Sequence, residues 1–567
     1  MSKDKYEIAS RPDNDDYLRF IPLGGLDEVG MNCALMECNG SMLMVDCGYT
    51  FPESESYGVD YILPDWSYVM DNLDRLDGVL LTHGHQDHIG ALPYFLQEVD
   101  VPLYSGEFTL KMVESQLKEH HLHDKVDMFP ISTDEMLEIG PFQIEFVHVN
   151  HSVPNARSIS LNTPVGRYIF TGDWKIDQMP LYEPVLDMQT FADFGRDGVR
   201  AVFGDSTNAE SEGFSNSEYE VFEGISNVAD DTEGRLIVAQ FSSNLHRLDN
   251  LMELAHRHDR KVLLMGRSIR DNVELAIEEG YLNLPDENIT IKPHQLDDFP
   301  ANRVMIICTG SQAEPRAAMT RMAYGDHHTV TLNEEDTVVL SARVIPGNER
   351  GIQQMLDELT RRGATVVTAK QAPIHGSGHA KPDEMKILLN LTEPDSLVPV
   401  HGHYRMRKKH AELAEDVGVP RQHVIENGDV LQFTSDDARV VGSVNPGRVL
   451  VDGANVGDLE SVALRDRAKL ADAGIIVAFV VMDKSAGELA AKPELIQRGL
   501  MGKESDTDID EMLSRAADAA EQGILQLSDN ARRDFNEVDD AIQRSVRKFF
   551  RRRIDRKPVV IPVIHEL

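Results

Sequence analysis

A run of metal-ligand residues at positions 83–88, His-Gly-His-Gln-Asp-His, constrains this chain more than any other feature. Imidazole nitrogens and carboxylate oxygens suit a cation such as Zn²⁺, and one turn can direct several of them to a shared centre. The run follows a short apolar segment, residues 78–82, that predicts a buried strand, and Gly84 allows a sharp turn. The alternative, surface histidines in a loop, requires four ligand-type residues to coincide. The sequence therefore predicts a metal site on a loop at a strand end.

Three later segments also place a ligand-type residue just after an apolar, strand-like stretch. These residues are His151, Asp173 and His401. Taken singly, each is more typical of a cap or a satisfied loop residue. Together with the 83–88 run they form a set large enough for two metal ions, with the Asp173 carboxylate as the expected bridge. Two ions about 3.5–4 Å apart can activate a water molecule for attack on phosphorus.

The pattern of strands and helices changes along the chain and predicts several domains, since 567 residues are too many for one core. Residues 1–16 predict a disordered polar tail, and residues 17–200 contain closely spaced short strands. Residues 201–370 alternate strands with helices, as in a parallel β/α sheet. Because His401 follows this cassette, we expect the cassette to be an insertion, with residues 371–443 completing the first domain. Residues 444–459 predict a linker, and residues 460–567 predict a third unit.

Composition limits the cellular compartments and the classes of partner that suit this chain. The net charge of −39, taken alone, argues against nucleic acid, because polyanion binding relies on Lys and Arg. Bound metal ions and two local basic clusters, 405–409 and 544–557, oppose this argument, although a solvated helix face is the alternative for the second cluster. The four cysteines form no paired framework, which fits a reducing cytoplasm. The sequence predicts no secretory signal and no membrane span.

Short motifs occur in order over nearly the whole chain. They are LGGLDEVGMN (23–32), VDCG (45–48), HGHQDH (83–88), NHSVP (150–154), TGDWK (171–175), GDSTN (204–208), TGSQ (309–312), SARVIPGNE (341–349), HGSGHA (375–380) and VHGHYR (400–405). In order and context they resemble the motifs of the metallo-β-lactamase fold and, more narrowly, those of the β-CASP nucleases of the bacterial ribonuclease J family. Gly376 and His403 depart from the family's usual Val and Glu.

The resemblance implies an α/β fold in three parts. These are a metallo-β-lactamase αββα sandwich, an inserted parallel-sheet β-CASP domain (201–370) and a small α+β C-terminal domain (460–567) used in self-association. It also implies two Zn²⁺ per chain, with Mn²⁺ or Mg²⁺ as other ions that could support activity. One metal would be held by His83, His85, His151 and Asp173, and the other by Asp87, His88, Asp173 and His401.

Further roles follow from the same resemblance. His379 is implied as the proton donor to the leaving oxygen. Asp46 and Asp205 are implied as carboxylates that orient ligating imidazoles, and Asp87 as a ligand at the reacting centre. A terminal 5′-monophosphate is implied to be held by Ser243, His375, Ser377 and Gly378. A structural histidine in a glycine-rich loop remains the alternative for His379, and a helix N-cap remains the alternative for Asp205.

The function implied is a zinc-dependent ribonuclease, a 5′→3′ exonuclease on 5′-monophosphorylated RNA with endonuclease activity, in rRNA processing and mRNA decay. The expected partners are single-stranded RNA, a homodimer or homotetramer, and proteins of the RNA-degradation machinery or the ribosome. A DNA nuclease or a small-molecule hydrolase of the same fold is an alternative, although the inserted cassette favours a channel over an open pocket. A non-catalytic RNA-binding scaffold is another, although the seven ligand-type residues oppose it.

Overall fold

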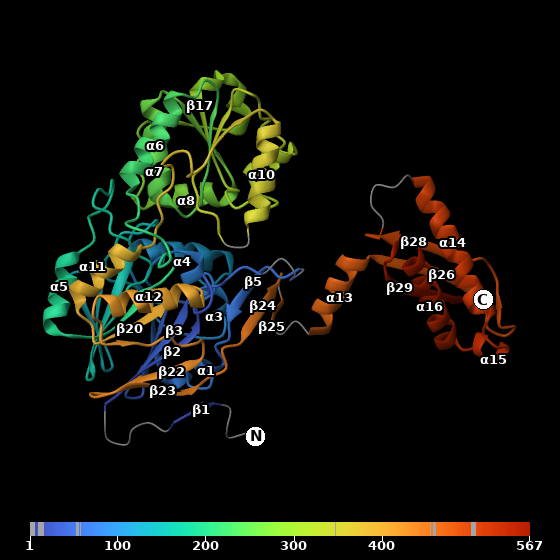
Figure 1. Cartoon of the computed structure of the whole chain (residues 1–567), viewed down its shortest axis with the longest axis horizontal. Helices are drawn as coiled ribbons and strands as arrows, with labels where there is room; N and C mark the ends of the chain where they lie inside the picture. The colour runs from blue at the N-terminus through green and yellow to red at the C-terminus, as the bar shows by residue number, and fades with distance from the viewer. Residues whose placement is uncertain are drawn as a thin grey trace. The chain divides into compact units, whose positions relative to one another are not determined.

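The computed structural model describes residues 6–9, 16–52, 56, 58–345, 348–453, 455–457, 461–500 and 506–567. The chain divides into two compact units (Figure 1). The first contains Met1–Thr50 and Leu63–Arg448, and the second contains Phe51–Ile62 and Val449–Leu567. Each unit has a hydrophobic core of its own.

Two sheets packed face to face form the centre of the first unit. The nine-stranded sheet runs in the order β1 (Glu7–Ile8), β23 (Ala438–Ser443), β22 (Asp429–Phe433), β2 (Leu18–Gly24), β3 (Cys33–Cys38), β4 (Ser41–Val45), β6 (Leu76–Leu80), β7 (Leu103–Ser105), β8 (Met128–Pro130). The seven-stranded sheet runs β21 (Arg421–Gln422), β20 (Ser396–Val400), β13 (Val199–Asp205), β12 (Gly166–Phe170), β11 (Arg157–Thr163), β10 (Phe142–His148), β9 (Met136–Ile139). Stacked and tilted rings of Phe20, Phe170 and Phe203 fill the space between the sheets.

Helices cover the outer faces of both sheets. The nine-stranded sheet is accompanied by α1 (Ser67–Met70), η1 (Leu73–Arg75), α2 (Gln86–Ile89), α3 (Leu92–Phe95) and α4 (Glu107–Glu119). The seven-stranded sheet is covered by α5 (Met188–Asp197), α11 (Pro382–Thr392) and α12 (Tyr404–Asp416). These layers confirm the predicted αββα sandwich.

The chain order of the strands collects candidate ligands at one edge of the sandwich. β12, β13 and β20 are neighbouring parallel strands, and Asp205 lies opposite Val400 in their register. The residues that follow the three strands therefore lie close together, and they include Asp173 and His401. On the other sheet β4 pairs in parallel with β6, so that Asp46 and the 83–88 run leave adjacent strands.

A parallel six-stranded sheet forms the inserted domain, as predicted. Its order is β16 (Thr290–Ile291), β15 (Lys261–Met265), β17 (Val304–Cys308), β14 (Leu236–Ala239), β18 (Thr337–Leu340), β19 (Thr365–Val367). It is surrounded by α6 (Glu218–Asp230), α7 (Leu245–Arg257), α8 (Arg267–Glu278), η2 (Pro293–Asp298), η3 (Ala301–Arg303), α9 (Ala318–Tyr324) and α10 (Glu349–Arg361). The expected start at residue 201 is too early, because β13 pairs within the sandwich and the insertion follows Asp205.

Two expected irregular segments contain strands. Within the expected tail 1–16, β1 pairs with β23 at the sheet edge, which supplies its backbone hydrogen bonds, while residues 1–5 and 10–15 lie outside the described residues. Within the expected linker 444–459, β24 (Arg448–Asp452) and β25 (Asn455–Gly457) form a three-stranded sheet with β5 (Tyr61–Pro64). Backbone pairing with distant strands decides both cases, and local composition does not reveal it.

The second unit is a small α+β domain. Its elements are α13 (Ser461–Ala473), β26 (Ile475–Asp483), β27 (Glu488–Leu489), β28 (Glu494–Arg498), α14 (Asp506–Leu525), α15 (Asp529–Arg532), α16 (Phe535–Ile554) and β29 (Val559–Glu566). β26 and β29, the two strands expected there, pair in parallel, and their alternate residues pack against α14 and α16. No helix among the described residues is both long and apolar enough to cross a membrane.

Candidate metal centre

The structure brings the seven predicted ligands into two groups that share Asp173, each with donor atoms within 4.8 Å of one another. In the first group His85 Nδ1 lies 3.0 Å from both His83 Nε2 and His151 Nε2. Asp173 Oδ2 lies 3.5 Å from His83 Nε2 and 3.6 Å from His151 Nε2. Three imidazole nitrogens and one carboxylate oxygen thus converge on one point, a donor set typical of zinc.

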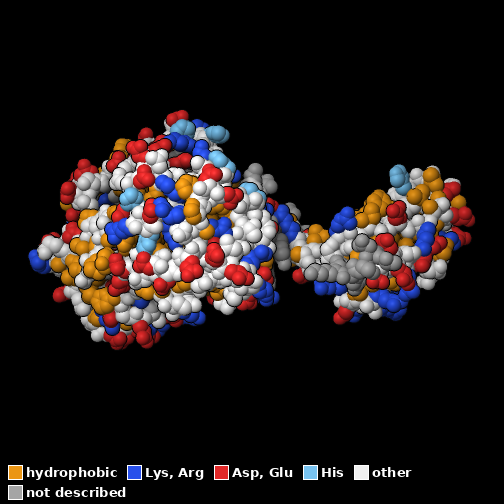
Figure 2. All heavy atoms as spheres, turned by 90° about the horizontal axis from the view of Figure 1, so that it is seen from above, with side chains coloured by type: hydrophobic (Ala, Val, Ile, Leu, Met, Phe, Trp, Pro, Cys, Tyr) orange, Lys and Arg blue, Asp and Glu red, His pale blue; other side chains and the backbone are white. Residues whose placement is uncertain are grey.

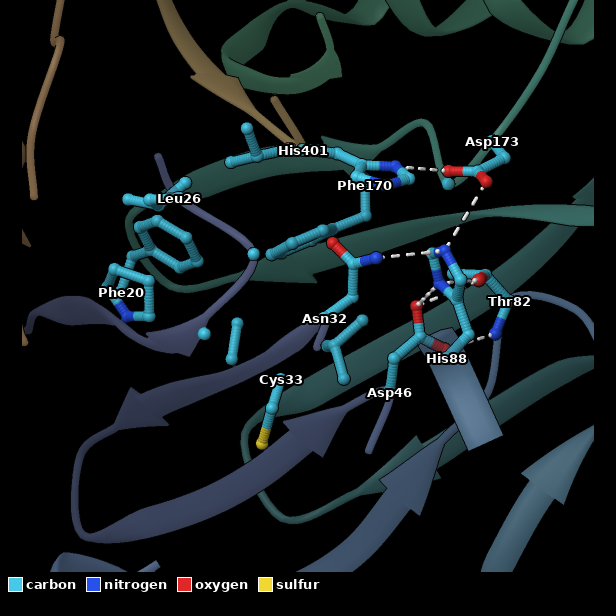
Figure 3. Close-up of a pocket in the computed structure, with 17 residues that line it drawn as sticks. Phe20, Leu26, Asn32, Cys33, Asp46, Thr82, His88, Phe170, Asp173 and His401 are labelled. Atoms are coloured by element: carbon cyan, nitrogen blue, oxygen red, sulfur yellow. Dashed lines mark hydrogen bonds and ion pairs between the residues drawn. The ribbon is translucent and has the colours of Figure 1, made fainter. Parts of the chain in front are cut away.

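The second group contains Asp87, His88, Asp173 and His401. His88 Nε2 lies 3.3 Å from Asp173 Oδ2 (Figure 3). Asp87 Oδ2 lies 3.5 Å from both His88 Nε2 and His401 Nε2. The buried Nε2 of His401 makes no hydrogen bond with any described residue. A buried nitrogen of this kind is costly unless it has a partner, so its position favours a bound cation.

The other ring nitrogen of two ligands, His88 and His151, is held by an oxygen that sets the ring's orientation. His88 Nδ1 donates to Asp46 Oδ2 at 2.7 Å, and Thr82 anchors that carboxylate through its backbone N–H and its hydroxyl, both at 2.8 Å (Figure 3). His151 Nδ1 donates to the Gly378 carbonyl at 2.6 Å. Such partners fix the tautomer and leave Nε2 free to bind metal. The geometry accords with the role expected for Asp46.

Asp205 and His379 lie directly beside the second group. His379 Nδ1 donates to Asp205 Oδ2 at 2.9 Å, and Thr207 donates to Asp205 Oδ1 from its backbone N–H at 2.9 Å and from its hydroxyl at 2.7 Å. Asp205 ends β13 and caps no helix, so the geometry disfavours the N-cap alternative. The same Nδ1 atom of His379 lies 3.9 Å from Asp173 Oδ2. An imidazole in this position can exchange a proton with a group bound at the centre.

Electrostatics at the centre favour divalent cations. Burial lowers the pKa of His83 and His151 well below the usual value and lowers that of His85 to about 4, so these ligands are neutral imidazoles. Burial acts against ionisation of Asp173, but the neighbouring imidazoles outweigh it and hold its pKa well below the usual range. Neutral imidazoles and an ionised carboxylate are the protonation states that metal binding requires. The first group is therefore in the state that binds a metal ion. In the second group the surrounding carboxylates outweigh burial, and they raise the pKa of His88 well above its usual value and that of His401 to about 10, so a bound cation would take the place of these protons.

The backbone at the centre is strained at two functional residues. Asp46 has φ 59° and His401 has φ 49°, in the left-handed region that non-glycine residues rarely adopt. Conformations of this kind cost about 1–3 kcal/mol each and persist where the surroundings impose them. The strain is consistent with positions where the direction of the side chain matters more than a relaxed backbone conformation.

A strap formed by residues 375–379 joins the inserted domain to the metal centre. Asn208 Nδ2 donates to Ser377 Oγ at 2.8 Å and to the His379 carbonyl at 2.9 Å. Gly378 is packed so tightly that a Cβ atom would lie 2.6 Å from His151 Cε1. The predicted phosphate-binding residue Gly378 therefore contacts a candidate metal ligand through its backbone.

The remaining predicted phosphate-binding residues lie around this strap. His375 Nδ1 lies 3.4 Å from Arg247 Nη1 on α7, and burial together with Arg247 lowers the pKa of His375 to about 3. Ser243 lies in the turn before α7, and no hydrogen bond among the described residues joins it to His375 or Ser377. His403 donates to the Asp27 carbonyl at 3.0 Å and belongs to neither ligand group.

A buried ionic network beside the strap was not predicted from the sequence. Arg247 binds Glu218 through two hydrogen bonds of 2.9 and 2.7 Å, and Lys175 lies 3.2 Å from Asp177 and 3.9 Å from Glu218. Arg343 donates to Asn208 and has no carboxylate partner among the described residues. Lys175 and Arg343 both lie in the sequence motifs, but their pairing depends on contacts between distant segments. Arg343 therefore leaves uncompensated positive charge next to the strap.

Comparison with known proteins agrees with this architecture. Family models match residues 26–191 (metallo-beta-lactamase superfamily), 233–359 (ribonuclease J, beta-CASP domain), 366–425 (Zn-dependent metallo-hydrolase RNA specificity domain) and 462–567 (ribonuclease J C-terminal domain). The fold and site thus define a metallo-hydrolase of the metallo-β-lactamase superfamily with a β-CASP insertion.

Full-length relatives make the assignment more specific. The chain is 37% identical to ribonuclease J 1 of Streptococcus pyogenes serotype M3, over 96% of each chain. It is 34% identical to ribonuclease J2 of Bacillus subtilis over 98% of this chain and 99% of that one, and 36% identical to ribonuclease J of Corynebacterium glutamicum over 96% and 76%. The chain belongs to the ribonuclease J family of metal-dependent ribonucleases. A solved structure of a protein of unknown function from Enterococcus faecalis V583 shares the fold, with TM-score 0.52 and 15% identity over 74% of this chain and 100% of that chain.

Proposed function

We propose that this chain is a two-zinc ribonuclease that degrades 5′-monophosphorylated RNA in the 5′→3′ direction and also cleaves internally. The observation that carries the proposal is the convergence of seven ligand residues into two groups sharing Asp173, beside the 375–379 strap. The ribonuclease J relatives and the RNA-specificity model support RNA as the substrate over DNA or a small molecule.

The chain's own side chains have distinct parts in this chemistry. When bound, the metal ions would activate the attacking water and neutralise charge on the phosphoryl oxygens. His83, His85 and His151 would hold one ion, Asp87, His88 and His401 the other, and Asp173 both. His379, held by Asp205, would protonate the leaving ribose oxygen, because that oxygen would otherwise depart as a strong base. Asp46 would keep His88 in the ligating orientation.

Recognition of the 5′ end is assigned to the strap and the loops around it. Ser243, His375 and Ser377 offer hydroxyl and imidazole groups to a terminal phosphate, and Gly378 offers its backbone. Arg343 adds positive charge that no described carboxylate neutralises, which suits a dianionic monophosphate. A 5′-triphosphate would need more space and more positive charge than these residues provide. The exonuclease is therefore expected to prefer a monophosphate end.

The substitution Ser377→Ala is expected to slow exonuclease cleavage of 5′-monophosphate RNA by about 10-fold or more, the usual effect of losing a hydrogen bond to a charged group. Internal cleavage of a circular RNA of the same sequence, which has no 5′ end, should change little. Both rates are measured by gel analysis, with Ser132→Ala, an exposed serine, as the control. Equal loss of both activities would show that Ser377 supports the metal centre or the fold instead.

Self-association through the second unit completes the proposal. One face of its sheet packs on α14 and α16, while the other face exposes apolar side chains. Phe479, Ile496, Ile561 and Val563 are 42%, 42%, 44% and 39% exposed. Apolar groups gathered on one sheet face favour association with a second copy of the chain.

A chain that ends near residue 455 should keep the seven ligands but be monomeric and weakly active. Phe479→Asp is the sharper test, because it leaves the unit's own core intact. It should raise the dissociation constant for self-association at least about 30-fold, the effect typical of an interface hot spot. Light scattering and RNA cleavage are measured together, with Leu525→Asp, also exposed, as the control. A wild-type chain that is monomeric at micromolar concentration, or a fully active truncated chain, would overturn the idea.

A further inference from the structure

The second unit carries a concentration of positive charge that the catalytic mechanism does not use. Eight of the 14 residues from 544 to 557 are basic, and only Asp555 is acidic, in a chain whose net charge is −39. The basic residues are all exposed, and they are Arg544, Arg547, Lys548, Arg551, Arg552, Arg553, Arg556 and Lys557. Blue side chains gather along one edge of this unit in Figure 2.

These cations have no acidic partners within the described part of the chain. Arg544 donates to the Asp540 carbonyl at 3.1 Å, and Arg556 donates to the Asp472 carbonyl. Among the described residues, no carboxylate lies within ion-pair distance of any of the eight, although basic residues elsewhere in the unit, such as Arg515 and Arg532, do form ion pairs. The charge of this segment is therefore available to an external anion.

Most of the cations lie on one face of α16. The opposite face is buried through Val538, Ile542, Val546 and Phe550. At 100° per residue, the five basic residues from Arg544 to Arg552 fall within about 140° around the helix and extend about 12 Å along it. This arrangement is a continuous cationic stripe, which we call the α16 stripe and define as Arg544, Arg547, Lys548, Arg551 and Arg552.

Helix stabilisation explains only part of the stripe. Cations favour the last turn of a helix, where they interact with the macrodipole, and this accounts for Arg551 to Arg553. Arg544 lies more than two turns before the helix end at Ile554. Placing Arg544, Arg547 and Lys548 close together without acidic partners is unfavourable by itself, so an anionic ligand would stabilise the surface.

The chemistry of the stripe favours a nucleic-acid backbone. Six of the eight basic residues are arginines, whose planar guanidinium groups bind phosphate with two parallel hydrogen bonds. An anionic membrane is a poorer match, because the exposed face of α16 carries no large exposed hydrophobic side chain that could enter a bilayer. A row of cations about 12 Å long matches two to three successive phosphates of an extended strand.

We propose that the α16 stripe is a second RNA-binding surface, which holds the phosphodiester backbone of the substrate outside the metal centre. The proposal rests on RNA as the substrate, but it does not depend on exonuclease polarity or on the identity of the metal. Because the rest of the chain is strongly acidic, this local attraction would supply much of the affinity for long RNA. Short RNA that reaches only the metal centre would not benefit from it.

The test uses the full-length protein with chelator, so that no cleavage occurs. Binding of a fluorescent 30-nucleotide 5′-hydroxyl RNA is measured by anisotropy across a KCl series. The test variant is Arg544→Gln/Arg547→Gln/Arg551→Gln. The matched control is Lys492→Gln/Arg515→Gln/Arg532→Gln, which removes three ion-paired charges from the same unit. Circular dichroism and light scattering verify that both variants keep the wild-type fold and oligomeric state.

The test variant is expected to bind RNA at least about 10-fold more weakly at low salt, with a salt slope smaller by about 2, since each single-strand phosphate contact contributes about 0.7. The control should change less than about 2-fold. Equal effects of the two variants, or binding to phosphatidylserine vesicles in place of RNA, would overturn the proposal. A wild-type protein that binds RNA through α16 but does not cleave it when zinc is supplied would contradict only the proposed function.

Discussion

Replacement of His83 by alanine is expected to lower the rate of RNA hydrolysis by more than about 10³-fold while leaving the fold intact, because the metal ions that it would help to hold would activate the attacking water and stabilise the transition state. His83 Nε2 lies 3.0 Å from His85 Nδ1 and 3.5 Å from Asp173 Oδ2, so its loss removes one corner of the first ligand group. Metal analysis should find about two ions per wild-type chain and fewer in His83→Ala.

The control for this experiment is His328→Ala, which removes an exposed imidazole of the inserted domain. It should retain the wild-type rate and metal content. Circular dichroism distinguishes loss of metal from loss of fold. Added zinc should restore chelator-treated wild type but not His83→Ala. A well-folded His83→Ala or His85→Ala protein with the wild-type rate would rule out the ligand assignment.

His379→Ala is expected to lower the rate of RNA cleavage by about 10²–10⁴-fold, the range typical of general acid catalysis, with unchanged metal content. His379 is not one of the seven predicted ligands, although its ring lies within 4.8 Å of the donor atoms of Asp173, Asp205 and His401. Asp205 holds its Nδ1 at 2.9 Å, which leaves Nε2 available for a leaving oxygen. Rate and metal content measured on the same sample therefore separate a proton donor from a ligand.

The leaving group provides the sharper distinction. A phosphodiester with a nitrophenolate leaving group needs little protonation, so His379→Ala should lose far less activity on that substrate than on RNA. His83→Ala should lose activity on both substrates, because both require the metals. Equal loss of both activities in His379→Ala would assign the residue a structural role in the strap.

Local sequence patterns were sufficient for much of the fold. The hairpin between β3 and β4 follows from Asn39 and Gly40, which adopt φ 49° and 99° as a tight turn requires. The alternation of strands and helices predicted the parallel inserted sheet, and His401 beyond it indicated that the chain returns to the sandwich. Short edge strands such as β1 and β16 were missed, because their few residues gain stability mainly from distant pairing partners.

Four of the seven candidate metal ligands are a local property of the chain. The 83–88 run holds four ligand-type residues within one turn, so chemistry and spacing alone predicted a metal site there. The remaining ligands were proposed from weaker local signals and from the family resemblance. Their selection depended on order and context along the whole chain.

Only the tertiary structure decided how the distant residues meet. His401 lies 228 residues after Asp173, and the parallel pairing of β12, β13 and β20 brings the two side chains to 2.8 Å. Gly378 lies 227 residues after His151, and the Lys175, Glu218 and Arg247 network joins segments of the sandwich and the insertion. Residue identity determines which groups can bind metal or pair charge. Which of them come into contact depends on sheet register and domain packing, since these arise from the combined burial of many residues that no short segment encodes.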